Sequence, residues 1–177
     1  MGSPRPLSLP ALVTDRLELR PVEVADLGLM VDLNADPRVM TYIQGRAATA
    51  DETYAEWRRR LEHQSDPERG LGYWAGFEGG AFVGWWSASS FAGRPEVSGI
   101  GYRLRAAAWG RGLATEGARA MVAQAFACAD LQRVVASTKA DNAGSRRVLE
   151  KVGMTHTGVG PREDDVRYEL DRASPAR

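Results

Sequence analysis

The chain has 177 residues, which is enough for one ordinary domain and too short for two substantial ones. Hydrophobic residues make up 44% and charged residues 26%, a typical globular composition, and 23 basic side chains balance 23 acidic ones. With zero net charge there is no general basic field to hold nucleic acid. No apolar run approaches the roughly 18 residues of a membrane span. We therefore expect neither nucleic-acid nor membrane partners.

A single cysteine, Cys128, excludes an internal disulfide and a multi-cysteine zinc site. The two histidines, His63 and His156, lack metal-ligand spacing, so we expect no metal. The first ten residues contain three prolines and no apolar signal core. These features predict a cytoplasmic protein.

The spacing of apolar residues predicts, in chain order, a strand, two helices, three strands, a helix, a strand, a helix and two strands. Their expected ranges are 16–22, 23–34, 49–66, 72–77, 81–91, 97–104, 114–129, 133–138, 142–152, 154–158 and 166–170. This order predicts an α/β fold with a mixed, mostly antiparallel central sheet and helices on both faces. We expect one domain over 13–172, a flexible arm over 1–12 and a tail over 173–177.

Two local signals refine these elements. Thr49 and Glu52 have the spacing of a capping box at the start of the second helix, and Asp141 or Asn142 caps the last helix. In the strand over 97–104, glycines at 99 and 101 predict a bulge or a close approach by another backbone or a ligand.

A glycine-rich loop, residues 109–115 (WGRGLAT), lies where a strand ends and a helix starts. Glycines allow a tight turn, and the first amides of a helix have no internal partner, so a phosphate or diphosphate is the natural ligand. A dinucleotide-binding fingerprint fails at its last position, Thr115, and a nucleoside-triphosphate loop would need a lysine. A plain connecting turn remains the alternative.

The same loop resembles the coenzyme A diphosphate loop of the GNAT acetyltransferase superfamily, although Trp109 replaces the usual Gln or Arg at its start. With the preceding Gly101 and Tyr102, it is similar to the RimJ/RimL branch of ribosomal-protein N-terminal acetyltransferases. Two further blocks agree in order, residues 14–21 (TDRLELRP) and the late block 142–154 (NAGSRRVLEKVGM). The resemblance implies a GNAT fold and acetyl transfer from acetyl-CoA to an amine by direct attack in a ternary complex.

The resemblance also implies where acetyl-CoA binds. The diphosphate would meet the loop residues Gly110, Arg111, Gly112, Leu113, Ala114 and Thr115. The pantetheine arm would pair like an extra strand with the edge near Tyr102 and Leu104. Asn142 would contact the same arm, and simple helix capping is the alternative reading of that residue.

Two proton transfers are needed. By resemblance, Ser145 protonates the departing thiolate; Tyr102 or Tyr168 could substitute, and Ser145 could instead bond only its own helix. Related enzymes often place a glutamate base where this chain has Gly99. The nearest carboxylate is Glu96, whose neighbours suggest a solvated loop, so water is an alternative proton carrier.

The absence of a glutamate base at position 99 affects which kind of amine the enzyme can accept. At pH 7 about 14% of an α-amine is neutral, against about 0.04% of a lysine amine. We therefore expect a peptide N-terminus or an amino-acid-like small molecule as acceptor, recognised by Tyr42, Trp85 and Trp86. Since Trp85 and Trp86 are adjacent in a strand, one packs in the core while the other lines a groove.

Other readings remain open. An aminoglycoside or polyamine could be the acceptor. The chain could instead be a non-catalytic coenzyme-A-binding sensor, or a methyltransferase that holds its cofactor with the glycine loop. Relatives are often dimers, so a homodimer is possible.

Overall fold

The computed structural model describes residues 9–128 and 130–173. Eight strands form one sheet in the order β1-β2-β3-β4-β5-β6-β8-β7. Their bounds are β1 Leu12–Val13, β2 Glu18–Pro21, β3 Gly72–Glu78, β4 Ala81–Ser90, β5 Val97–Leu104, β6 Arg133–Lys139, β7 Thr155–Val159 and β8 Asp165–Asp171. Neighbouring strands are antiparallel except β5 and β6, which are parallel.

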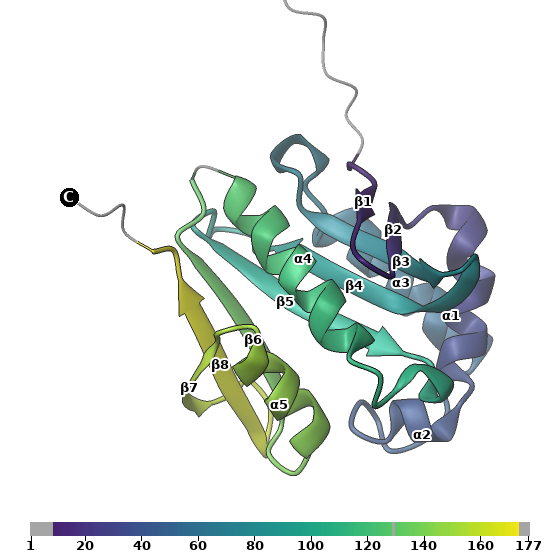
Figure 1. The fold of residues 1–177 in the computed structure, drawn as a ribbon. Helices are drawn as coiled ribbons and strands as arrows, with labels where there is room; N and C mark the ends of the chain where they lie inside the picture. Colours follow the sequence, from purple (N-terminus) through teal and green to yellow (C-terminus); the bar gives the residue numbers. More distant parts are fainter. Residues whose placement is uncertain (1–8, 129, 174–177) are drawn as a thin grey trace, which may run out of the picture.

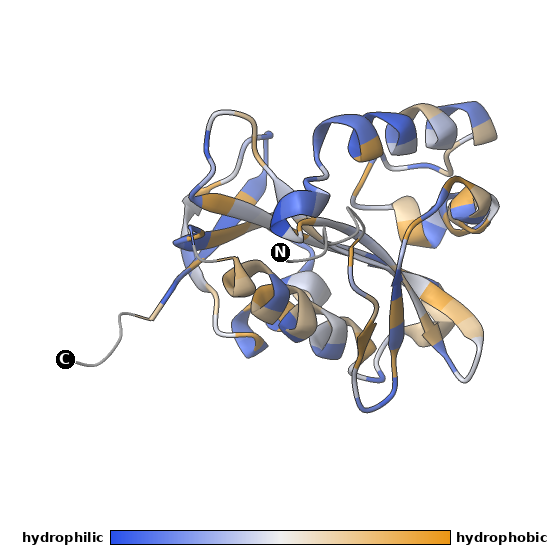
Figure 2. Cartoon of the chain, turned by 90° about the horizontal axis from the view of Figure 1, so that it is seen from above, coloured by the Kyte–Doolittle hydropathy of each residue, from blue (hydrophilic) through white to orange (hydrophobic). Residues whose placement is uncertain are grey.

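Within the described residues, five α-helices flank this sheet: α1 Leu27–Asn34, α2 Pro37–Met40, α3 Ala50–His63, α4 Leu113–Ala127 and α5 Ala143–Lys151. In Figure 1, α4 and α5 lie in front of the sheet and α1 to α3 lie behind and beside it. The view from above in Figure 2 shows the two groups of helices on opposite sides of the strands. The predicted α/β class, with a mostly antiparallel sheet and helices on both faces, is therefore confirmed.

Each face of the sheet has its own hydrophobic core, and β4 contributes side chains to both cores. Because side chains alternate along a strand, Trp86 packs under α4 with Leu113 and Met121, whereas Trp85 packs toward α3 with Trp57. Trp86 leaves no room for a Cβ at Gly76 or Gly117, where it would lie 2.3 and 2.4 Å from the indole. These close approaches hold α4 directly against β3 and β4.

The predicted helix ends are mostly confirmed. Thr49 and Glu52 form the expected capping box, and Asn142 caps α5 by accepting from the Ser145 amide. The first helix opens as a 3-10 turn over Val24–Asp26, and α3 ends three residues before the expected boundary. The helix expected over 114–129 runs from Leu113 to Ala127, and residue 129 lies outside the described residues.

Sequence periodicity misses the shortest elements. Asp36 caps the four-residue α2, in which Pro37 takes the first position, and two residues form β1. The end of the expected arm packs on the sheet, because the Trp74 indole donates to the Pro10 carbonyl at 2.7 Å. Residues 1–8 and 174–177 lie outside the described residues.

The expected bulge in β5 is wrong. The register with β4 runs without interruption from Gly84↔Leu104 to Ser90↔Ser98. The space beside the glycines is instead occupied by side chains, and not by another backbone: a Cβ at Gly99 would lie 2.7 Å from the Ser89 Oγ, and one at Gly101 would lie 2.9 Å from the Ser87 Oγ. Within the described part of the chain, no helix is long and apolar enough to cross a membrane.

Candidate active site

The parallel strands β5 and β6 pair with each other along only part of their length. Registered pairs are Val97↔Arg133, Ser98↔Val134 and Gly99↔Val135, and none follows among the described residues. Beyond that point β5 stays paired with β4 and β6 stays paired with β8, so the two strands diverge, as Figure 1 shows. Their facing edges therefore present backbone groups that an extended ligand can pair with.

The glycine loop lies at the end of β5 that borders this opening. Gly110 and Gly112 have φ values of +72° and +83°, a region that other residues rarely occupy. The first bond of α4 runs from the Glu116 amide to the Gly112 carbonyl at 3.0 Å. The amides of residues 110–115 have no hydrogen-bond acceptor among the described residues. Free amides at a helix start, together with its dipole, suit an anion.

A distant segment braces the loop. The Arg16 guanidinium donates to the Arg111 carbonyl at 2.8 Å and to the Glu116 carboxylate at 2.7 Å, and the Thr14 hydroxyl also donates to Glu116. Burial works to raise the pKa of Glu116, but the bonds from Thr14 and Arg16 outweigh it and lower that pKa. The Arg111 side chain pairs with Glu78 at 2.8 Å, so its charge lies on the neighbouring hairpin.

Two hydroxyls meet at the opening. The Tyr102 hydroxyl lies 2.9 Å from the Ser145 Oγ and also donates to the Ser145 carbonyl at 3.2 Å. Burial raises the pKa of Tyr102 to about 12, and the bond with Ser145 offsets this only in part. Tyr102 is therefore a neutral proton donor at physiological pH, and Ser145 connects it to the first turn of α5.

Tyr168, the other candidate acid, is fully buried and already engaged. Its hydroxyl donates to Glu150 at 3.1 Å and accepts from the Arg146 guanidinium at 3.1 Å. At the end of β5, Leu104 has a buried side chain, and its carbonyl accepts from the Trp109 indole at 3.0 Å. The structure thus brings Tyr102, not Tyr168, to Ser145.

Glu96 lies far from this pair. It sits in an exposed turn before β5, where it pairs with Arg94 at 3.3 Å. Tyr102 lies six positions further along the extended chain, roughly 20 Å away at about 3.3 Å per residue. A general base must reach the proton that it removes, so Glu96 is not placed to deprotonate an acceptor in the opening.

A cavity of about 230 Å³ lies where β5 and β6 begin to part, on the α3 side of the sheet. Gly99 and Gly101 are in its lining, with residues 135–137 of β6 on one side and Arg60 of α3 on another. Trp85 also lines it, whereas Trp86 is fully buried on the opposite face, where its indole donates to the Ala114 carbonyl. Tyr42 lines a different hollow of about 600 Å³, between residues 41–45 and the end of β6.

A buried polar network lies behind this cavity. Glu56 accepts from Arg60 at 2.8 Å and from Arg103 at 3.3 Å, and Arg103 also donates to Asn34 at 2.6 Å. Burial works to raise the pKa of Glu56, but the two guanidiniums outweigh it and lower that pKa. Sequence spacing gave no sign of this network, because its members come from α1, α3 and β5.

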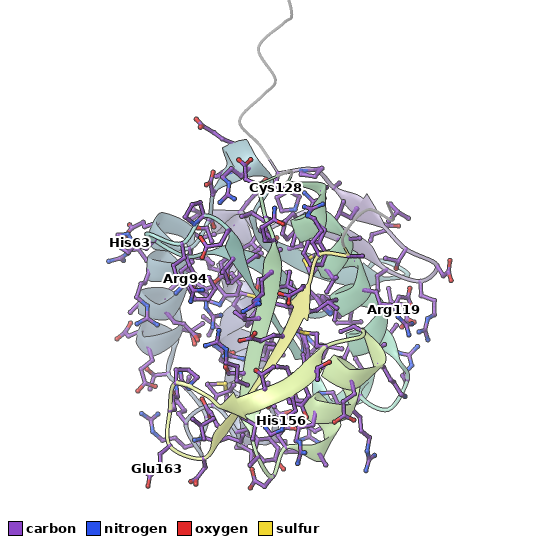
Figure 3. The ribbon with its side chains drawn as sticks, turned by 90° about the vertical axis from the view of Figure 1, so that its left-hand side faces the viewer. His63, Arg94, Arg119, Cys128, His156 and Glu163 are labelled. Atoms are coloured by element: carbon purple, nitrogen blue, oxygen red, sulfur yellow. The ribbon has the colours of Figure 1, made fainter. Side chains whose placement is uncertain are left out.

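No carboxylate lines the cavity, and no group of three or more His, Cys, Asp or Glu side chains among residues 9–128 and 130–173 is arranged to hold a metal. Figure 3 shows His63 and His156 on separate elements, α3 and β7. The cavity therefore lacks an acidic side chain that could serve as a base.

The residues fit coenzyme A. The free amides of 110–115 suit its diphosphate, the unpaired β5 edge suits the amide-containing pantetheine arm, and Tyr102 and Ser145 lie beside that edge. The side chain of Leu113 is buried in the core, so its amide alone is available.

The sequence profile described as acetyltransferase (GNAT) domain matches residues 16–155. The FsC-acetyl coenzyme A-N(2)-transacetylase of Aspergillus fumigatus is 35% identical over 185 aligned residues, covering 92% of this chain and 77% of that protein.

Two solved structures share the architecture. An acetyltransferase from Agrobacterium tumefaciens is 28% identical, with a TM-score of 0.78 over 93% of this chain and 96% of its own. RimL, a ribosomal L7/L12 α-N-protein acetyltransferase in complex with coenzyme A, is 18% identical, with a TM-score of 0.76 over 91% and 97%, a likeness of fold alone. The chain thus belongs to the GNAT acetyltransferase family and is an acetyl-CoA-dependent N-acetyltransferase.

Proposed function

We propose that the enzyme acetylates a primary α-amine, on a peptide N-terminus or an amino-acid-like small molecule, by direct attack in a ternary complex. Acetyl-CoA supplies the acetyl thioester. The amides of residues 110–115 bind its diphosphate, the β5 edge from Tyr102 to Leu104 pairs with its arm, and Asn142 adds a contact from the cap of α5. The ordered sequence blocks support a place in the RimJ/RimL branch, and we also propose a cytoplasmic enzyme that forms a homodimer.

The cavity beside Gly99 carries the acceptor part of this proposal. It contains no carboxylate, and the close approach of Ser89 leaves no room for a side chain at that position. Without a strong base, the enzyme depends on the fraction of acceptor that is already neutral, which is several hundred times larger for the α-amine of a peptide than for a lysine amine at pH 7. Water in the cavity then carries the proton away.

The Tyr102 and Ser145 hydroxyls provide the proton for the leaving thiolate. Either can donate in the bond between them, so one hydroxyl gives its proton to the departing sulfur while the other supports it, and the donor takes back a proton from solvent before the next turnover. A donor with a pKa of about 12 keeps its proton until the negative charge develops nearby.

Mass spectrometry of an acceptor panel incubated with enzyme and acetyl-CoA tests the proposal. The panel contains peptides with free and blocked N-termini, free amino acids, Nα-blocked lysine, an aminoglycoside and a polyamine. We expect acetylation at α-amines and little at lysine-type amines. A preference for lysine amines, the aminoglycoside or the polyamine would contradict the proposed acceptor, and coenzyme binding without any acetylation would indicate a sensor.

A further inference from the structure

The cavity at the parting of β5 and β6 has an uneven distribution of charge. Arg60 is the one charged side chain among the residues that line it. Behind it, Arg60 and Arg103 share a single carboxylate, Glu56, while Asn34 and Thr53 contribute only neutral groups. The wall of the cavity on the α3 side therefore carries a net positive charge.

Two hydrogen-bond donors in that wall lack a partner. Arg60 Nη1 and Trp85 Nε1 are shielded from solvent and bond to no acceptor among the described residues. The guanidinium carbon of Arg60 lies 4.5 Å from the centre of the Trp85 ring, so the two side chains stack. Buried donors without partners are costly, and an acceptor group on a ligand would relieve that cost.

The side of the cavity opposite Arg60 borders the opening between β5 and β6, where the proposed reaction takes place. Residues 99–101 of β5 and 135–137 of β6 line it at the point where these strands separate. An amine presented to the opening would therefore have the remainder of its molecule directed toward Arg60. The walls there are aromatic, formed by Tyr73, Trp85 and Phe91.

We infer that the acceptor is an apolar amino acid with a free carboxylate, which Arg60 and Trp85 bind while its α-amine faces the opening. This inference rests on the proposed function and narrows it, since a peptide N-terminus carries an amide carbonyl at the same position. A free carboxylate raises the pKa of the neighbouring amine above that of a peptide N-terminus, so the bond with Arg60, and not a large neutral fraction, would favour this acceptor. Charge-assisted bonds to a guanidinium are stronger than neutral ones.

The test compares apolar amino acids with their carboxamides, which differ only at the group that Arg60 binds. We would measure kcat/KM for both series, each corrected for its fraction of neutral amine. The wild-type enzyme should favour the carboxylate by about ten- to hundredfold, the usual effect of one charge-assisted bond. Arg60→Met should remove this preference by lowering kcat/KM for the carboxylates much more than for the carboxamides, and Arg60→Lys should keep part of it.

Arg59→Met is the matched control, because Arg59 is the exposed neighbour on α3; it should leave the preference unchanged. If Arg60→Met does not fold, Arg60→Lys and the wild-type comparison still decide the question. Equal rates for acids and amides, or an Arg60 effect equal in both series, would overturn the inference while leaving α-amine acetylation intact. Failure to acetylate any panel amine, with the coenzyme still bound, would overturn the proposed function and this inference together.

Discussion

The Tyr102 hydroxyl lies 2.9 Å from the Ser145 Oγ, which connects β5 to α5 beside the opening between β5 and β6. If this pair protonates the leaving thiolate, Tyr102→Phe and Ser145→Ala should each lower kcat by about 10- to 100-fold. The double variant should lose little more than either single one, because the two residues act as a unit. Steady-state kinetics should show a much smaller change in the KM for acetyl-CoA.

Tyr168→Phe serves as the control for that prediction. It removes a phenol hydroxyl that is bonded to Glu150 and Arg146. We expect kcat to remain within about threefold of wild type. If Tyr168→Phe instead abolished turnover while Tyr102→Phe did not, the proton donor would have to be reassigned.

Alkaline pH should destabilise the fold through Tyr102. Its pKa is about 12 in the folded protein because of burial, against an ordinary value of 10.0. Between those values the unfolded chain loses this proton first, so the free energy of unfolding falls as pH rises, by up to about 3 kcal/mol. Urea titrations from pH 9 to 12 should show a smaller decline for Tyr102→Phe, and parallel declines would exclude Tyr102 as a cause.

Gly112→Ala should weaken coenzyme A binding by about tenfold or more. The substitution opposes a φ of +83° at the start of α4, and the new Cβ would lie 3.4 Å from the Arg16 guanidinium. Gly93→Ala is a matched control, since Gly93 has a φ of +74° with open space around its Cβ position. Both variants should lose similar stability, but calorimetry should show normal binding only for Gly93→Ala.

Gly99→Ala should destabilise the protein by about 1–3 kcal/mol, because its Cβ would meet the Ser89 Oγ at 2.7 Å. Ser89→Ala removes that oxygen and with it a bond to the Gly99 carbonyl. In the Ser89→Ala background, Gly99→Ala should therefore cost less, a coupling that denaturant unfolding of all four proteins measures. Additive effects would show that Ser89 does not limit this position.

The residues of the glycine loop could be predicted from sequence because their signal is local. Glycines at 110 and 112 and the helix start at Leu113 follow from neighbouring residues alone. Arg16, which braces that loop, could not be predicted, because it meets Glu116 across 100 residues of chain.

The glycines in β5 predict a bulge or a close approach by a backbone or a ligand, but the structure places the side chains of Ser87 and Ser89 beside them, which the sequence of β5 alone does not show. The alternation of Trp85 and Trp86 predicted opposite faces, but the coverage of each face depends on α3 and α4. The sequence does not predict the buried position of Arg60, because an arginine on an amphipathic helix usually faces solvent, whereas this one stacks on Trp85.

Three registered residue pairs are all that join the five strands β1 to β5 to the three strands β6 to β8 within the described sheet. A coenzyme lying along both free edges would extend this short seam and act as a removable ninth strand. Ligand at a hundred times its Kd adds about 2.7 kcal/mol of stability to a folded protein. Amide hydrogen exchange at Ile100 to Leu104 and at Ala136 to Lys139 should therefore slow on coenzyme binding, so that the enzyme is most rigid when it is loaded for turnover.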